Sequence, residues 1–144
     1  MTSISEFTID RYDEVSALMN RAPGVAVREA DSREATERYL LRNPSLSFIA
    51  EEEGKIIGLA MCGHDGRRGY LQHVIVAPEC RGRGVADALV TRCLAGLEVL
   101  GIVKTHIDVF VANEAANRYW KRRGWKKRDD VYRYSMTRSK DENA

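Results

Sequence analysis

The sequence has few cysteines, little net charge and no long hydrophobic run. Its three cysteines, Cys62, Cys80 and Cys93, are odd in number and lack the spacing of a metal site, which favours a reducing, cytoplasmic compartment. A net charge of +2 is too small to indicate nucleic-acid or membrane binding by itself. No apolar run approaches the length of about 20 residues that spans a bilayer, and residues 1–6 lack the regions of a secretory signal.

The composition is that of an ordinary soluble protein. Of the 144 residues, 44% are hydrophobic and 31% are charged, which suits a single domain with a substantial core. We expect this domain to cover residues 1–138 and to be followed by a frayed tail at 139–144.

The chain carries both strand and helix patterns. Strands are expected at 4–8, 46–50, 56–62, 70–76, 105–111 and 131–136, and helices after Asp10, from 31 to 41, from 84 to 100 and from Asn113 to Gly124. The acidic residues at 51–53 fit a solvated hairpin turn better than a metal site, because no neighbouring histidine or aspartate completes a ligand set. The strand at 105–111 should lie parallel to that at 70–76 through a right-handed crossover.

One stretch joins a buried strand to a helix through a glycine turn. The β-branched run Val74–Val76 ends a strand, Pro78 stops it, and helical spacing begins at Val85. Between them lie two arginines and two glycines in alternation: Arg81, Gly82, Arg83 and Gly84.

This turn is suited to binding phosphate or pyrophosphate. Gly82 and Gly84 lack Cβ atoms, so a ligand can approach the backbone closely. The first N–H groups of the helix have no partner within it and carry partial positive charge, to which Arg81 and Arg83 add two full charges. The alternative is a solvated arginine turn without a ligand.

At this point the sequence resembles the GNAT superfamily of acetyl-CoA-dependent N-acetyltransferases. Arg81, Gly84 and Ala86 fit the Arg/Gln-x-x-Gly-x-Gly/Ala motif of that family. The block from Asn113 to Trp125 is similar to its second conserved block, with an Asn, an Ala, an aromatic pair and a closing Gly-aromatic. The resemblance implies an α/β fold with a mixed, splayed central sheet flanked by helices.

The resemblance also implies acetyl-CoA as co-substrate, with no metal. The backbone of Val74, Ile75 and Val76 would pair with the pantetheine arm. Asn113 would reach the pantetheine or the cysteamine region. Backbone amides of the turn would hold the pyrophosphate: Arg81, Gly82, Arg83, Gly84, Val85 and Ala86.

Transfer of an acetyl group to an amine requires removal of a proton from that amine. Asp108 is the first candidate base, because a carboxylate in an apolar strand is costly unless it is partnered or faces a cleft. Some relatives have a Glu at the corresponding place, five residues before the Asn. The alternative is a structural aspartate that pairs with His106 or an arginine. His73 is a second candidate base.

The proton donor to the departing thiolate has several candidates in the sequence. Relatives often have a Tyr seven residues after the Asn, where this chain has Trp120, whose indole N–H cannot act as a general acid. Tyr119 is the chosen candidate, although it is rotated by roughly 100° from that direction on a helix. Tyr132, Tyr134, water or no acid at all are the alternatives, and Tyr119 is equally compatible with a core aromatic.

Several other functions remain open at this stage. A dinucleotide-binding, Rossmann-like protein is disfavoured because Asp87 occupies the position of the third small residue. The basic segment at 118–128 could bind nucleic acid but is more typical of a solvated helix face. Cys80 could form an acyl-enzyme, or the protein could bind CoA without catalysis. We expect a small-molecule or peptide amine as acceptor, no nucleic-acid or membrane partner, and leave a homodimer open.

Overall fold

The computed structural model describes residues 1–144, which form two compact units, residues 1–108 and residues 109–144. The first unit contains a five-stranded sheet with strands in the order β1-β2-β3-β4-β5. Its strands are β1 (Thr2–Glu6), β2 (Phe48–Glu52), β3 (Lys55–His64), β4 (Gly69–Val76) and β5 (Thr105–Ile107). Neighbouring strands are antiparallel except β4 and β5, which are parallel as predicted.

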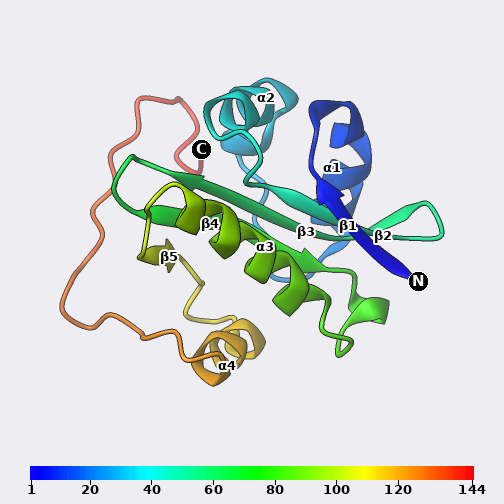
Figure 1. The fold of residues 1–144 in the computed structure, drawn as a ribbon. Helices are drawn as coiled ribbons and strands as arrows, with labels where there is room; N and C mark the ends of the chain where they lie inside the picture. The colour runs from blue at the N-terminus through cyan, green and yellow to red at the C-terminus, as the bar shows by residue number, and fades with distance from the viewer. The chain divides into compact units, whose positions relative to one another are not determined.

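Helices cover both faces of this sheet. Helices α1 (Tyr12–Arg21) and α2 (Arg33–Arg42) lie on one face, and α3 (Val85–Val99) lies on the other (Figure 1). The surroundings of two glycines of β3 show which helix covers each face of the sheet. A Cβ on Gly58 would lie 3.0 Å from Val85 and 3.1 Å from Leu89 of α3, whereas one on Gly63 would lie 2.7 Å from the Tyr39 hydroxyl of α2. The predicted mixed α/β fold is therefore confirmed.

Apolar residues at helical spacing form the core between the sheet and its helices. Val15, Leu18 and Met19 of α1 are buried on one side. Leu89 and Leu97 of α3 are fully buried on the other. This burial follows the sequence pattern, since residues three or four apart share one face of a helix.

The sheet splays between β4 and β5. These strands pair only at Gly69–Thr105, Tyr70–His106 and Leu71–Ile107. On the other edge of β4, Leu71 pairs with Cys62 and His73 with Met61, so Gln72 is an extra residue in β4. Such a bulge bends a strand and increases its twist, which turns the rest of β4 away from β5. The expected strand at 105–111 is thus wrong beyond Ile107.

The second unit contains one helix, α4 (Glu114–Arg122). The side chain of Asn113 caps its start by accepting a hydrogen bond from the amide of Ala116 at 3.1 Å. Gly124 adopts a φ of +84° just beyond its end, as the sequence predicts. Trp120 is buried and makes edge-to-face contacts with Tyr119 and Trp125.

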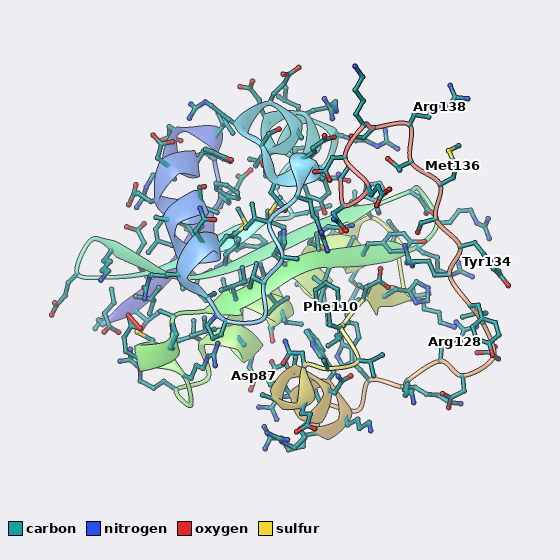
Figure 2. All side chains as sticks on the ribbon, turned by 180° about the vertical axis from the view of Figure 1, so that it is seen from behind. Asp87, Phe110, Arg128, Tyr134, Met136 and Arg138 are labelled. Carbon is teal, nitrogen blue, oxygen red and sulfur yellow. The ribbon has the colours of Figure 1, made fainter.

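The strand expected at 131–136 does not form. Tyr132, Tyr134 and Met136 are largely exposed, and the last two project outward from an irregular segment (Figure 2). A strand needs a neighbour for its backbone N–H and C=O groups, and the second unit contains no other strand. None of the helices is both long enough and apolar enough to cross a bilayer. The proposed division at residue 138 remains a prediction.

Candidate active site

A turn with two glycines joins β4 to α3. After Val76, a 3-10 turn (η3, Pro78–Cys80) leads to Gly82 and Gly84, which have φ values of +78° and +77°. Residues with a Cβ adopt this left-handed backbone only under strain. A Cβ on either glycine would meet no atom within 4 Å. The glycines are therefore needed for the bend, and the space beside them is open.

Helix α3 begins directly after this turn without a side-chain cap. Gly84 is its N-cap residue and has no side chain to accept hydrogen bonds from the first amides. The helix is 15 residues long, so its aligned peptide dipoles place partial positive charge at this end. Backbone amides at the start of a helix can bind an anion where the space beside them is open. The residues of this turn therefore fit a diphosphate.

The two arginines of the turn have different surroundings. Arg83 forms an ion pair with Glu52 of β2 at 3.3 Å, and its Nε donates to the carbonyl of Cys80 at 3.5 Å. Hydrogen bonding to Cys80 and the charge of Glu52 raise the pKa of Arg83, so it stays positively charged. Arg81 is exposed, and its Nε donates to the carbonyl of Val76 at 3.5 Å. An incoming phosphate would compete with Glu52 for Arg83.

The end of β4 has a strand on only one side. Val74, Ile75 and Val76 pair with Ala60, Leu59 and Gly58 of β3. No strand of the sheet pairs with them on the side of β5. Such an edge presents outward-directed N–H and C=O groups that an extended ligand can bind as another strand would. This edge runs directly into the glycine turn.

A buried histidine–aspartate pair lies on the opposite face of β4 from α3. His73 Nε2 is 2.7 Å from Oδ1 of Asp31, which ends the 3-10 turn η2 (Glu29–Asp31). Burial acts to raise the pKa of Asp31, but hydrogen bonds from His73 and from the Arg28 amide outweigh it and hold this pKa below its ordinary value. Asp31 is therefore a carboxylate near neutral pH.

Comparison with known proteins assigns the family. Residues 12–125 match the model of the Acetyltransferase (GNAT) family. The chain belongs to the GNAT acetyltransferase family.

Curated relatives of this GNAT protein are acetyltransferases. One from Photorhabdus laumondii is 37% identical over 116 residues, which covers 78% of each chain. One from Sodalis glossinidius is 32% identical over 128 residues, which covers 89% of each chain.

Solved structures share the fold at lower identity. The PaiA N-acetyltransferase of Thermoplasma acidophilum, in complex with coenzyme A, has a TM-score of 0.77 and 15% identity, and the match covers 85% of this chain and 88% of that one. AAC(6')-Iy, in complex with a bisubstrate analogue of CoA and acetylneamine, has a TM-score of 0.76 and 22% identity, with 95% and 99% covered.

The GNAT protein is therefore an acetyl-CoA-dependent acetyltransferase, as the resemblance implied. Its sheet also argues against the Rossmann alternative, because only one of its four strand pairs is parallel.

The structure changes the basis for choosing Asp108. This residue follows β5 rather than lying within a strand, and its side chain is exposed. The cost of burying a carboxylate, on which the expectation depended, therefore does not arise. The preceding residue, Ile107, pairs with Leu71, so Asp108 follows the point where β5 leaves β4.

Asn113 and Tyr119 belong to the second unit, and their catalytic and binding roles remain predictions. The Asn113 side-chain oxygen caps α4, which leaves the side-chain N–H groups to donate. Tyr119 is half-buried, with the Arg123 guanidinium 5.1 Å from its ring centre. Trp120 is the buried member of this aromatic pair.

Two further residues change the sequence interpretation. Cys80 is only 6% exposed, which disfavours it as an acyl-accepting nucleophile. Asp31 was expected only to start a helix, and its contact with His73 was missed. The sequence carries no local signal for this contact, because the two residues are 42 positions apart.

Proposed function

We propose that this GNAT enzyme transfers the acetyl group of acetyl-CoA to a primary amine by direct attack in a ternary complex. The observation that carries the proposal is the continuity of three features: the unpaired edge of β4, the open glycine turn and the uncapped start of α3. An extended pantetheine arm needs strand-like backbone partners, and the diphosphate that follows it needs amides and positive charge.

Each part of acetyl-CoA has proposed partners in this arrangement. The backbone of Val74, Ile75 and Val76 pairs with pantetheine, and Asn113 donates to the same arm. Amides of the turn and of the first turn of α3 bind the diphosphate, with Arg81 and Arg83 neutralising its charge: Arg81, Gly82, Arg83, Gly84, Val85 and Ala86. The open space at Gly82 and Gly84 supports this fit.

The reaction follows from the chemistry of an ammonium and a thioester. The ammonium first loses a proton to a base, and the amine nitrogen then attacks the thioester carbon. A backbone N–H near Val76 stabilises the negative charge that develops on the oxygen. The C–S bond breaks as the amide forms, and the second proton of the nitrogen leaves as the thiolate becomes CoA thiol. Asp108 and His73 are the candidate bases, and Tyr119 is the proposed proton donor.

The acceptor is proposed only as a class. Structural neighbours of the fold include AAC(6')-Iy with an acetylneamine analogue and the NatB acetyltransferase complex with a bisubstrate inhibitor. Small-molecule amines and peptide amines are therefore the two groups to compare. Both present a primary ammonium at neutral pH.

A thiol-release screen tests the proposal. The wild-type protein is incubated with acetyl-CoA and three amines: a peptide with a free α-amino group, a lysine peptide with a blocked N-terminus, and neamine. We expect stoichiometric CoA release and acetylated amine by mass spectrometry with at least one of them. Calorimetry should detect binding of CoA but not NADH. Binding of CoA without transfer to any amine in this or a wider library would favour a non-catalytic module.

A further inference from the structure

The His73–Asp31 pair joins two segments of the first unit that are distant in sequence. His73 lies in β4, beside the strand segment proposed to bind pantetheine. Asp31 lies in η2, between α1 and α2. Their side chains are 18% and 9% exposed, and Nε2 and Oδ1 are 2.7 Å apart. A contact this short between two largely buried polar groups restricts the ring to a narrow range of orientations.

The bulge at Gln72 directs His73 toward Asp31. Gly58 faces α3, so Cys62, four residues along β3, faces the same side and Met61 faces the opposite one. Cross-strand partners share a face, which places Leu71 on the α3 side and His73 on the side of α1 and α2. In a regular strand, residues 71 and 73 would share one face. The extra residue therefore moves the imidazole to the face where η2 lies.

Asp31 is fixed on each of its other polar atoms. Its Oδ2 accepts a hydrogen bond from the Arg28 amide at 2.9 Å, and its backbone carbonyl accepts one from the Tyr12 hydroxyl at 2.6 Å. Its carboxylate can only accept, so the 2.7 Å contact requires a hydrogen on His73 Nε2. In the neutral ring, Nδ1 then carries the lone pair that can receive a proton.

We propose that His73 is the catalytic base that deprotonates the acceptor ammonium, and that Asp31 is a positioning residue that fixes its tautomer and the orientation of its ring. This inference rests on the proposed function and assigns the role for which Asp108 was the first candidate. One ammonium proton moves to Nδ1 of His73, and the resulting imidazolium is paired with the Asp31 carboxylate. The ring later releases this proton to solvent, so the protein is unchanged after each cycle.

The surrounding charges support a proton carrier at this position. Asp31 is the carboxylate in contact with the ring, and Arg28 is the cation whose charge acts on Asp31. Tyr12 contributes a neutral hydroxyl to the Asp31 backbone. Asp108, by contrast, is exposed beyond the end of β5. A base that is ordered before the substrate binds needs less reorganisation during the reaction.

Four variants test the inference with the amine that the thiol-release screen identifies among the three named probes. We expect His73→Ala to lower kcat by about 100-fold, the lower range for loss of general-base catalysis. Its Kd for CoA should stay within about twofold of wild type, and added imidazole should restore part of kcat. His64→Gln is the matched control, because His64 is also a strand histidine and its ring accepts a hydrogen bond from the Gly66 amide in the following turn. It should retain wild-type kcat, and Asp108→Asn compares the two candidate bases, with a smaller loss of kcat expected than in His73→Ala.

Asp31→Asn separates positioning from a purely structural role. Loss of the carboxylate removes the acceptor that holds the Nε2–H of His73, so kcat should fall about tenfold while KM for the amine and Kd for CoA stay within about twofold of wild type. Nitrogen-15 NMR of the wild-type protein should show His73 in the Nε2–H tautomer, which is a readout that does not require the variant to fold.

The outcomes distinguish this inference from the proposed function. Wild-type kcat in His73→Ala, an Nδ1–H tautomer, or wild-type kcat in folded Asp31→Asn would overturn the inference while leaving acetyl transfer intact. A large loss in Asp108→Asn alone would return the role to that residue. Failure of the wild-type protein to acetylate any amine would overturn both.

Discussion

Substitution of Gly84 by alanine should weaken CoA binding more than it weakens the fold. Gly84 has a φ of +77°, and so does Gly54, in the β2–β3 hairpin. A Cβ at either position would meet no protein atom within 4 Å. The two glycines therefore have the same backbone demand and the same open surroundings, but only Gly84 lies at the start of α3.

The expected magnitudes follow from this match. An L-residue in left-handed conformation costs about 1–2 kcal/mol, which is partly offset by about 0.4–1 kcal/mol from the reduced freedom of the unfolded chain. Both Gly84→Ala and Gly54→Ala should therefore lose up to about 1.6 kcal/mol of stability, or roughly 3–6 °C in Tm. At Gly84 the added methyl also enters the space proposed for the diphosphate. Loss of one charge-assisted hydrogen bond, about 1.5 kcal/mol, would raise Kd about tenfold.

Calorimetric titration with CoA and thermal unfolding without ligand measure the two effects separately. We expect similar Tm values for the two variants and a tenfold higher Kd only for Gly84→Ala. A wild-type Kd in Gly84→Ala would refute the proposed binding of the diphosphate at this turn. A Kd increase of the same size in Gly54→Ala would show instead that CoA binding reports general stability.

Three further predictions concern charge and packing. Arg83→Gln should raise the Kd for CoA about tenfold, and Glu52→Gln should lower it a few-fold, because Glu52 competes with phosphate for Arg83. Calorimetry at low and high salt measures both Kd values, and an unchanged Kd in Arg83→Gln would contradict a contact between Arg83 and phosphate. The lowered pKa of Asp31 contributes stability above the ordinary aspartate pKa of about 3.9, and this contribution is lost as pH falls through the folded-state pKa. Urea unfolding should therefore show a stability difference between wild type and Asp31→Asn that shrinks as the pH falls below about 4; a difference that persists at lower pH would contradict an ionised Asp31. Leu89→Ala should lower the free energy of unfolding by about 2–5 kcal/mol, because Leu89 is fully buried between α3 and the sheet, and a loss under 1 kcal/mol would indicate looser packing there.

The binding elements were the most predictable part of the chain because their signals are local. The glycines at 82 and 84 predict a turn, and helical spacing of apolar residues begins immediately after them. The structure confirms both, with α3 starting at Val85. Asn113 likewise caps α4 as its position before the helix suggests. In these segments, neighbouring residues alone decide the conformation.

The ends of the sheet were predicted poorly because pairing is not a local property. Val109 and Val111 continue the alternation of β5, yet β5 ends at Ile107 where β4 turns away. Residues 131–136 alternate in the same way and remain irregular. Alternation indicates that a strand is compatible with a segment, whereas a strand also requires a partner. The Asp31–His73 contact was missed for a related reason, since it joins an irregular segment to a strand.

Because of the bulge at Gln72, the course of β4 depends more on how many residues the strand contains than on which residue occupies position 72. The Gln72 side chain is exposed, so many substitutions there should leave β4 intact. Deleting this one position would leave Leu71 opposite Cys62 and His73 opposite Met61, so both side chains would keep their faces, but β4 would lose the bulge and the bend that comes with it. In this part of the enzyme, a change in chain length is thus a more severe mutation than a change in chemistry.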